Sequence, residues 1–207
     1  MNGVADDARQ TAILEAAWQC FAAYGFRKTS MEDIAHGAGL SRPALYQYYR
    51  NKEDIFRRLA QVFFAEAAVE LRRALNGPGT VPEVLAAGFA AQGGRILEAM
   101  LKSPHGIELI DTSRAAARDI AEAGEAQLAA IFAEWLEASR AAGRIGFAGT
   151  PQEVAATMAA ALKGLKSAAP DYDVYLANQE RLAHLIGGGL AAGAPANRPA
   201  GAPGRVA

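Results

Sequence analysis

Several features that define large classes of proteins are scarce or absent in this sequence of 207 residues. Its single cysteine, Cys20, excludes an internal disulfide framework and a cysteine-based zinc cluster, and a packed thiol is its simplest role. No apolar run reaches the ~18 residues typical of a transmembrane helix, and residues 1–7 are acidic, unlike a secretory signal. We therefore expect a cytoplasmic protein that does not enter a membrane.

The motifs of known catalytic sites are also missing. The sequence contains no Gly-rich phosphate loop, no HExxH motif and no arrangement of a nucleophile with a general base. His105, Glu108 and Asp111 could ligate a metal ion, but their spacing is loose, and residues near the start of a helix commonly serve capping and solvation. We therefore expect no enzyme activity, no cofactor and no metal site.

Strand signals are absent as well. Apolar residues recur at intervals of three and four rather than two, and β-branched residues do not cluster, so we predict an all-α fold of about nine helices. The predicted helices cover residues 9–24, a short stretch after residue 30, 42–49, 52–75, 82–102, 104–110, 113–142, 151–168 and 172–190. The tail, 191–207, is rich in Ala, Gly and Pro and is expected to be disordered.

The most informative pattern lies in residues 29–56, which read as two short helices around a glycine turn, followed by the start of a third helix. Ser30 can cap the first of these helices and Ser41 the second. Gly39 lies where a helix ends with a positive φ. This layout predicts a helix-turn-helix with residues 42–49 as the recognition helix, and it indicates DNA as the partner.

The charge distribution supports a DNA contact only locally. A formal net charge of -1 argues against bulk electrostatic binding to nucleic acid. Between residues 27 and 52, however, there is a local excess of three positive charges: Arg27, Lys28, Arg42, Arg50 and Lys52 against Glu32 and Asp33. A solvated polar surface is the alternative interpretation of this cluster, and the helix-turn-helix pattern around it favours DNA.

The sequence resembles the tetracycline-repressor (TetR) family of transcriptional regulators over about residues 9–57. The matching residues are Ile34, Ala35, Ala38, Gly39, Leu40, Ser41, Leu45, Tyr46, Tyr48, Tyr49, Asn51, Lys52 and Glu53, with Ile13, Leu14, Ala16, Ala17, Cys20, Phe21 and Gly25 upstream. The remainder is similar to the family only in length and helical character. The resemblance implies a helix-turn-helix DNA-binding domain (1–51) and a helical ligand-binding and dimerisation domain (52–190).

Individual residues of the recognition helix suit base recognition in the major groove. Gln47 can pair bidentately with adenine, Arg42 can reach a guanine edge or a phosphate, and Ala44 can contact a thymine methyl group. The resemblance implies that Tyr46 and Tyr48 grip the DNA backbone, although packing in the core is the alternative for Tyr46.

Further residues are predicted to bind phosphates. The resemblance implies that Lys52 is a phosphate ligand and that Leu45 and Tyr49 face the core, and Thr29 and the helix start after Ser30 can add phosphate contacts. The complete predicted DNA-binding set is Thr29, Ser30, Ser41, Arg42, Pro43, Ala44, Tyr46, Gln47, Tyr48 and Lys52.

Two C-terminal helices are the candidates for dimerisation. Residues 151–168 carry small side chains and residues 172–190 carry a larger stripe: Ala155, Ala156, Ala159, Ala160 and Gly164 on the first, and Tyr175, Asn178, Leu182, Leu185 and Ile186 on the second. The resemblance implies that these helices form a four-helix interface in a two-fold homodimer. The alternative is that both stripes fill the core of the monomer.

A small-molecule site is predicted around the helix of residues 82–102. Gln92 lies within its apolar stripe, and Gly88, Gly93 and Gly94 each cost about 1 kcal/mol relative to Ala, which suggests a kink or room for another group. The predicted ligand-binding residues are Phe89, Gln92, Ile96, Met100, Phe132, Trp135 and Met158. Such walls are typical of a pocket for a largely apolar molecule, and equally of an ordinary core.

We therefore interpret the sequence as a ligand-responsive, DNA-binding transcriptional regulator. We expect a dimeric repressor that a small apolar effector releases from a palindromic operator. A DNA-binding architectural protein without ligand control is the first alternative, and an all-α enzyme with an incidental helix-turn-helix is the second.

Overall fold

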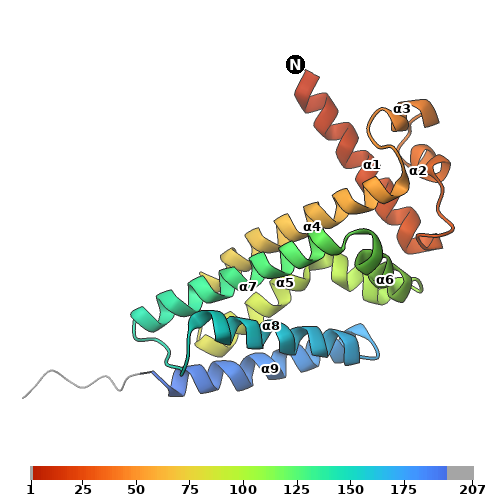
Figure 1. Cartoon of the computed structure of the whole chain (residues 1–207). Helices are drawn as coiled ribbons and strands as arrows, with labels where there is room; N and C mark the ends of the chain where they lie inside the picture. The colour runs from red at the N-terminus through yellow and green to blue at the C-terminus, as the bar shows by residue number, and fades with distance from the viewer. Residues whose placement is uncertain (1, 195–207) are drawn as a thin grey trace, which may run out of the picture.

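The computed structural model describes residues 2–194, without the side chains of residues 2–5, 94–97, 99–101, 107, 110, 113 and 114. In this part of the chain it contains nine α-helices and no strand, which confirms the predicted all-α fold (Figure 1). The helices are α1 (Asn2–Tyr24), α2 (Met31–Gly37), α3 (Arg42–Tyr46), α4 (Lys52–Leu75), α5 (Val81–Lys102), α6 (Gly106–Ala116), α7 (Arg118–Ala141), α8 (Pro151–Ala168) and α9 (Tyr172–Ala192). None of these helices combines the length and the apolar character that crossing a bilayer requires.

Most helix starts are fixed by local side chains. Ser30 and Asp33 form a reciprocal capping box at the start of α2, and the side chains of Ser41 and Asn51 accept backbone hydrogen bonds at the starts of α3 and α4. Gly39 has a φ of 67° in the turn between α2 and α3, a conformation that glycine adopts without strain. The caps Ser30 and Ser41 and the turn at Gly39 are therefore where the sequence predicted them, and Asn51 is a third cap.

Several boundaries differ from the prediction. The helix α1 begins at Asn2 rather than near residue 9, α9 continues to Ala192, and the predicted tail beyond residue 194 lies outside the described residues. The recognition helix α3 ends at Tyr46 and not at residue 49. The last turn is tighter than an α-helical turn. The backbone N–H groups of Gln47 and Tyr48 donate to the carbonyl oxygens three residues earlier, those of Ala44 and Leu45.

The break that we predicted near residues 111–112 lies instead at Ala117, between α6 and α7. Ala117 has a φ of -134° and offers no side-chain cap to α7. The guanidinium of Arg57 on α4 donates from Nη1 to the carbonyl oxygen of Ala116 at 2.8 Å, so it satisfies a carbonyl at the end of α6. A partner 59 residues away stabilises this break, and the local sequence carries no signal for it.

Two hydrophobic cores organise the chain. The head core joins α1, α2, α3 and the first turns of α4 with residues from α6 and the α6–α7 junction; its buried members are Ile13, Ala17, Phe21, Ile34, Ala35, Leu45, Ile55, Phe56, Leu109 and Ala117. The body core fills the space among α4, α5, α7, α8 and α9. Leu109 and Ala117 are completely buried in the head core, so residues far beyond residue 51 contribute to it.

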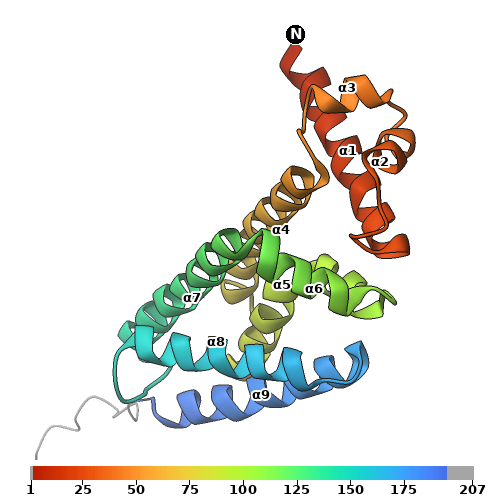
Figure 2. The same cartoon turned by 45° about the vertical axis from the view of Figure 1, so that its right-hand side comes forward.

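The helix α4 connects the two cores. It leaves the head and runs into the body, where it packs against α5 and α7. In turn α5 packs on α9, and α7 packs on α8, so α8 and α9 form the edge of the body that is remote from the head (Figure 2). The fold therefore separates the helix-turn-helix and the outer helix pair at opposite ends of the molecule.

Candidate nucleic-acid interface

The helix α3 divides its side chains between core and solvent. Leu45 is completely buried in the head core, whereas Arg42, Pro43 and Gln47, the C-cap residue, are exposed. Tyr46 is 43% exposed, so the core packing that we considered as its alternative role does not occur. The exposed residues offer a guanidinium, an amide and a phenol, which are groups that contact base edges and phosphates.

Arg42 is held at the surface by two neighbours. Its guanidinium lies 5.7 Å from the centre of the Tyr46 ring and 3.4 Å from a carboxylate oxygen of Glu32 on α2. The contacts with Tyr46 and Glu32, in that order, raise the pKa of Arg42. The side chains of Arg42 and Glu32 are 57% and 72% exposed, so water screens the pair and DNA can displace it. The sequence did not indicate Glu32 as a partner of a predicted base-reading residue.

Two other predicted contact residues are only partly accessible. Ala44 and Tyr48 are half-buried, and Tyr48 packs against the head core together with Tyr49. Burial of Tyr49 raises the pKa of its hydroxyl. The inward orientation predicted for Leu45 and Tyr49 agrees with this packing, and Tyr48 shares its surface between the core and the solvent.

The hydroxyls of Ser30 and Ser41 serve the helix starts. Ser30 Oγ donates to Asp33 Oδ2 at 2.7 Å and accepts from the Asp33 N–H at 3.2 Å, and Ser41 Oγ accepts from the Ala44 N–H at 3.4 Å. The capping hydrogen bonds from Ser30 lower the pKa of Asp33. Both serines are exposed, so a phosphate could still reach them. Their phosphate contacts stay a prediction.

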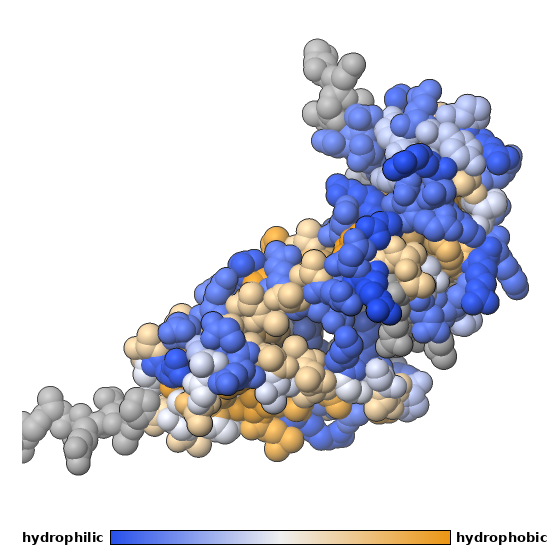
Figure 3. Space-filling model, viewed as in Figure 1, coloured by the Kyte–Doolittle hydropathy of each residue, from blue (hydrophilic) through white to orange (hydrophobic). Residues whose placement is uncertain are grey.

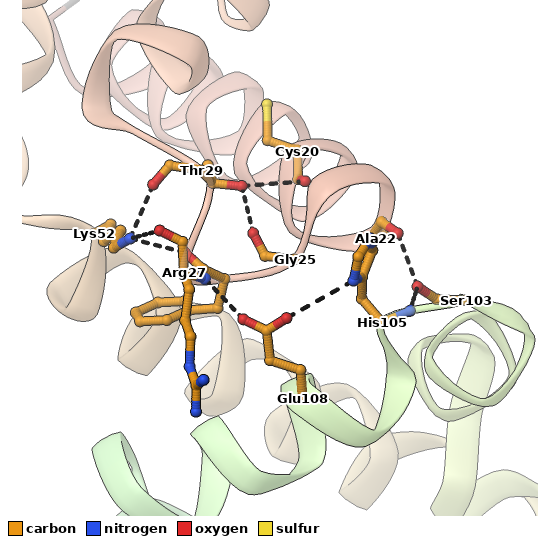
Figure 4. Close-up of polar contacts among 10 residues, drawn as sticks. Cys20, Ala22, Gly25, Arg27, Thr29, Lys52, Ser103, His105 and Glu108 are labelled. Atoms are coloured by element: carbon orange, nitrogen blue, oxygen red, sulfur yellow. Dashed lines mark hydrogen bonds and ion pairs between the residues drawn. The ribbon is translucent and has the colours of Figure 1, made fainter.

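The structure corrects the predicted role of Thr29. Its side chain is 2% exposed, and its hydroxyl lies against the end of α1, 2.8 Å from the carbonyl oxygen of Gly25 and 3.2 Å from that of Cys20 (Figure 4). Cys20 lies near the C-terminal end of α1, and Gly25 is the residue that follows the helix. Thr29 therefore closes the α1–α2 loop from inside, and its hydroxyl does not face DNA.

Lys52 also has a structural role that we did not predict. Its ammonium group donates to the carbonyl oxygens of Phe26, Arg27 and Thr29 at 2.8, 3.0 and 2.9 Å, and it lies 4.7 Å from the centre of the Phe26 ring. An ammonium group has three N–H donors, and the three carbonyls use all of them. Lys52 thus fixes the α1–α2 loop to the start of α4, and the predicted phosphate contact is not consistent with this geometry.

An open groove of about 610 Å³ lies beside the helix-turn-helix, lined by α1, α2 and the start of α3. Cys20 and Tyr24 line it from α1, and the exposed His36 lines it from α2. Burial, followed by the charge of Asp33, raises the pKa of the Cys20 thiol. A raised pKa keeps the thiol protonated and unreactive, which agrees with a packing role.

The predicted ligand-binding residues fall partly within the body core. Phe89, Phe132, Met158 and Trp135 are buried there. The rings of Phe89 and Phe132 pack edge to face, with 5.7 Å between their centres. Gln92 is half-buried. The side chains of the two remaining members of the set lie outside the described residues: Ile96 and Met100. A ligand site here therefore stays a prediction.

Some polar features of the body were missed by the sequence analysis. Gln179 of α9 is 3% exposed and donates from Nε2 to the carbonyl oxygen of Phe89 at 2.5 Å and to the Tyr175 hydroxyl at 3.4 Å. Burial raises the pKa of Tyr175 to about 12. The indole N–H of Trp135 has no hydrogen-bond partner within the described part of the chain.

Gly88 was interpreted as leaving room for another group. A Cβ at this position would lie 2.8 Å from the side chain of Leu75, so close packing against α4 explains the glycine.

The outer faces of α8 and α9 are partly apolar and free in the monomer. Leu185 is 74% exposed, and a Cβ added at Gly164, Gly188 or Gly189 would meet only open space. Figure 3 shows apolar residues gathered along this lower edge, below the polar surface of the head. The predicted stripes divide: Ala155 and Tyr175 fill the monomer core, whereas Ala156, Ala160 and Leu185 remain exposed.

No group of three or more His, Cys, Asp or Glu residues is arranged to hold a metal ion among the residues that the structure describes. His105 and Glu108 instead lie against the head, with 3.7 Å between Nδ1 and a carboxylate oxygen.

The fold and the surface of α3 define an all-helical protein with a helix-turn-helix head. The sequence model described as "Bacterial regulatory proteins, tetR family" matches residues 13–59. Over residues 13–59 the chain is therefore similar to this family, which agrees with the resemblance seen in the sequence.

Individual relatives are similar over about a third of this chain. An uncharacterized HTH-type transcriptional regulator of Bacillus subtilis, YfiR, is 38% identical over 65 residues, which are 31% of this chain and 32% of the relative. An HTH-type transcriptional repressor of Mycobacterium tuberculosis is 37% identical over 71 residues, which are 34% of this chain and 38% of the relative. The alignments thus span about a third of the length of these relatives.

The whole fold is similar to solved structures. The crystal structure of a transcriptional regulator from Cytophaga hutchinsonii superposes with a TM-score of 0.73 over 86% of this chain and 96% of that chain, at 19% sequence identity. At this level of identity the likeness concerns the fold alone.

Proposed function

We propose that the chain is a transcriptional regulator that binds duplex DNA through the exposed face of α3. One observation carries the proposal: Arg42, Tyr46 and Gln47 are exposed while Leu45 of the same short helix is completely buried. A buried anchor holds the helix rigidly, and the exposed groups can then enter the major groove in a fixed orientation. The match of residues 13–59 to the tetR family model and the two regulators of similar sequence support the same function.

The proposed assembly is a homodimer that binds a palindromic operator. The exposed small residues of α8 and the exposed Leu185 of α9 support pairing through these helices, because small side chains allow close approach and Leu185 gains a partner. A two-fold axis through this edge would present the two heads to two half-sites on one face of the duplex.

The proposed control is release by a small, largely apolar effector that binds in the body among the predicted residues around Gln92, which makes the protein a repressor. Phe89, Phe132 and Met158 supply an apolar wall, and the half-buried amide of Gln92 supplies a polar handle. Gln92→Leu is expected to change which compounds bind while it leaves operator affinity intact. Thermal unfolding with a panel of compounds compares the two proteins. If the same compounds stabilise the wild-type chain and Gln92→Leu, the proposed role of Gln92 is wrong.

The test of DNA recognition is selection of duplexes from a random pool by the full chain, followed by titration of the selected duplex at several salt concentrations. We expect one enriched near-palindromic motif that is bound about 10³-fold or more tightly than unrelated duplex. Enrichment of no motif, with a steep salt dependence on every duplex, would favour an architectural protein over a regulator.

A further inference from the structure

The α1–α2 loop, residues 25–30, is held from two sides by helices outside the helix-turn-helix. Lys52 of α4 bonds its carbonyl oxygens on one side. On the other side, Glu108 of α6 accepts a hydrogen bond at Oε1 from the backbone N–H of Arg27 at 2.8 Å (Figure 4). The hydroxyl of Ser103, just before α6, donates to the carbonyl oxygen of Ala22 near the end of α1 at 2.7 Å.

The fit between α6 and the loop is close. Gly25 has a φ of 82°, and a Cβ at this position would lie 2.4 Å from Glu108 Oε2. A side chain at Gly25 would therefore clash with the carboxylate that bonds Arg27. The next residue of α6, Leu109, is completely buried in the head core. Polar and apolar contacts thus bind one face of α6 to the head at the same place.

The loop leads directly to the start of α2. Glu108 accepts a hydrogen bond from the backbone of Arg27. The buried Thr29 follows two residues later, and the next residue, Ser30, caps α2. Because Ser30 both ends this loop and caps α2, a displacement of the loop would move the start of α2, and α3 follows α2 in the same head. Glu108 therefore contacts the loop that leads to α2 directly from α6, in addition to the contact that Lys52 makes from α4.

We propose that Glu108 is a positioning residue that couples α6 to the DNA-binding head through the α1–α2 loop, by a connection parallel to α4. The inference rests on the proposed function, because it assigns regulation to the same head. A carboxylate acceptor makes the bond to the Arg27 N–H charge-assisted, and such bonds are stronger than those between neutral groups. Removal of the carboxylate leaves the apolar contact of Leu109 in place and breaks the polar one.

The coupling is measurable without a known effector, because linkage between two sites is reciprocal. Amide hydrogen exchange of the full chain is recorded with and without the duplex selected from the random pool. In the wild-type chain we expect DNA to slow exchange in the head and also in the segment from Ser103 to Leu109, by roughly 5-fold or more. In Glu108→Ala we expect protection of the head to persist and protection of this segment to be lost.

Three further measurements separate coupling from simple destabilisation. Glu108→Gln retains an acceptor oxygen and should restore part of the DNA-dependent protection. Without DNA, the Arg27 amide should exchange faster in Glu108→Ala than in the wild-type chain. Glu134→Ala removes a carboxylate that pairs with Arg72 at 3.5 Å on the body, and this control should behave like the wild-type chain.

The outcomes are distinct. If the wild-type chain binds DNA and the segment from Ser103 to Leu109 shows no protection, or if Glu108→Ala retains it, the inference is wrong and the proposed function stands. If no duplex is bound specifically, the proposed function is wrong and the inference is overturned with it.

Discussion

At the scale of single residues, the head distinguishes side chains that can meet DNA from side chains that hold the head together. Arg42, Tyr46 and Gln47 belong to the first group because they are exposed on a short helix. Thr29 and Lys52 belong to the second because their donors are used by carbonyl oxygens of the chain itself. The sequence could predict the first group from its position after a cap, but the second depends on how the α1–α2 loop folds back on α1 and α4.

For Gln47→Ala we expect a loss of about 1–3 kcal/mol in binding free energy at particular base pairs, because an amide that pairs bidentately with adenine carries sequence information. Competition among single-base variants of the selected duplex measures this change. Gln127→Ala on α7 is the control, since Gln127 is exposed and far from the head in sequence. An unchanged preference at every base pair would remove Gln47 from the contact surface.

For Lys52→Met we expect a loss of stability rather than a uniform loss of DNA affinity. Three carbonyl oxygens lose a charged donor, and hydrogen bonds to charged groups contribute roughly 1.5–3 kcal/mol each, reduced here by partial exposure. Urea unfolding should show a lower midpoint for Lys52→Met than for Lys28→Met, which removes an exposed charge from the same loop. Equal midpoints, combined with weaker binding to all duplexes and a smaller salt slope, would restore the phosphate contact for Lys52.

At the scale of helices, local chemistry explains which predictions succeeded. The starts of α2, α3 and α4 depend on the caps Ser30, Ser41 and Asn51, whose partners lie three residues away, so the sequence contained the whole signal. The break at Ala117 and the contact between Glu108 and Arg27 depend on partners 59 and 81 residues away, and periodicity alone cannot reveal them. The short α3 was predicted too long because its core-facing residues continue beyond its last helical turn.

The junction between α4 and α7 gives a pH-dependent prediction. Hydrogen bonds from Arg57 to both carboxylate oxygens of Asp119, at 2.7 Å each, lower the pKa of Asp119 to about 2 from the usual 3.8. A lowered pKa in the folded state adds stability that is present above pH 4 and is lost as the pH falls from about 4 toward 2.

We therefore expect Asp119→Asn to lower the melting temperature above pH 4, and expect the difference from the wild-type chain to shrink as the pH falls below 4. Thermal unfolding followed by circular dichroism over this range measures the difference. In an Arg57→Ala background the substitution should have little effect at any of these pH values. A difference between the two proteins that is constant with pH would show that the ion pair does not contribute to folding.

At the scale of the whole molecule, the proposed DNA-binding and pairing surfaces lie at opposite ends, and α4 connects the head to the body. The sequence predicted both surfaces, because the caps mark the head and small residues mark α8, and pairing through α8 stays a prediction. The sequence could not show which members of the two stripes are buried within the monomer. Ala155 and Tyr175 point inward, because α8 packs mainly on α7 and α9 packs mainly on α5. The sequence also could not predict that Leu109 and Ala117 join the head core. The helix-turn-helix pattern ends before them, and nothing in that pattern calls for further core residues.

For Leu185→Glu we expect dissociation of the dimer, because a charge would replace an apolar side chain that is 74% exposed in the monomer and buried in the proposed interface. Sedimentation velocity at micromolar concentration measures the change, and operator affinity should fall with it. Val69→Glu on α4 is the matched control, since Val69 is 65% exposed and lies outside α8 and α9. A Leu185→Glu chain that remains dimeric would place the interface elsewhere.

Recognition of DNA by a pair of heads is tested by the affinity of the wild-type chain for the selected duplex as the spacing between the two half-sites is changed. Insertion of about five base pairs turns one half-site to the opposite face of the duplex, where the second head cannot reach it. We predict two chains per duplex at the parent spacing and a large loss of affinity after the insertion. Equal affinity at both spacings, or one chain per duplex, would contradict a paired regulator that reads DNA through two α3 helices.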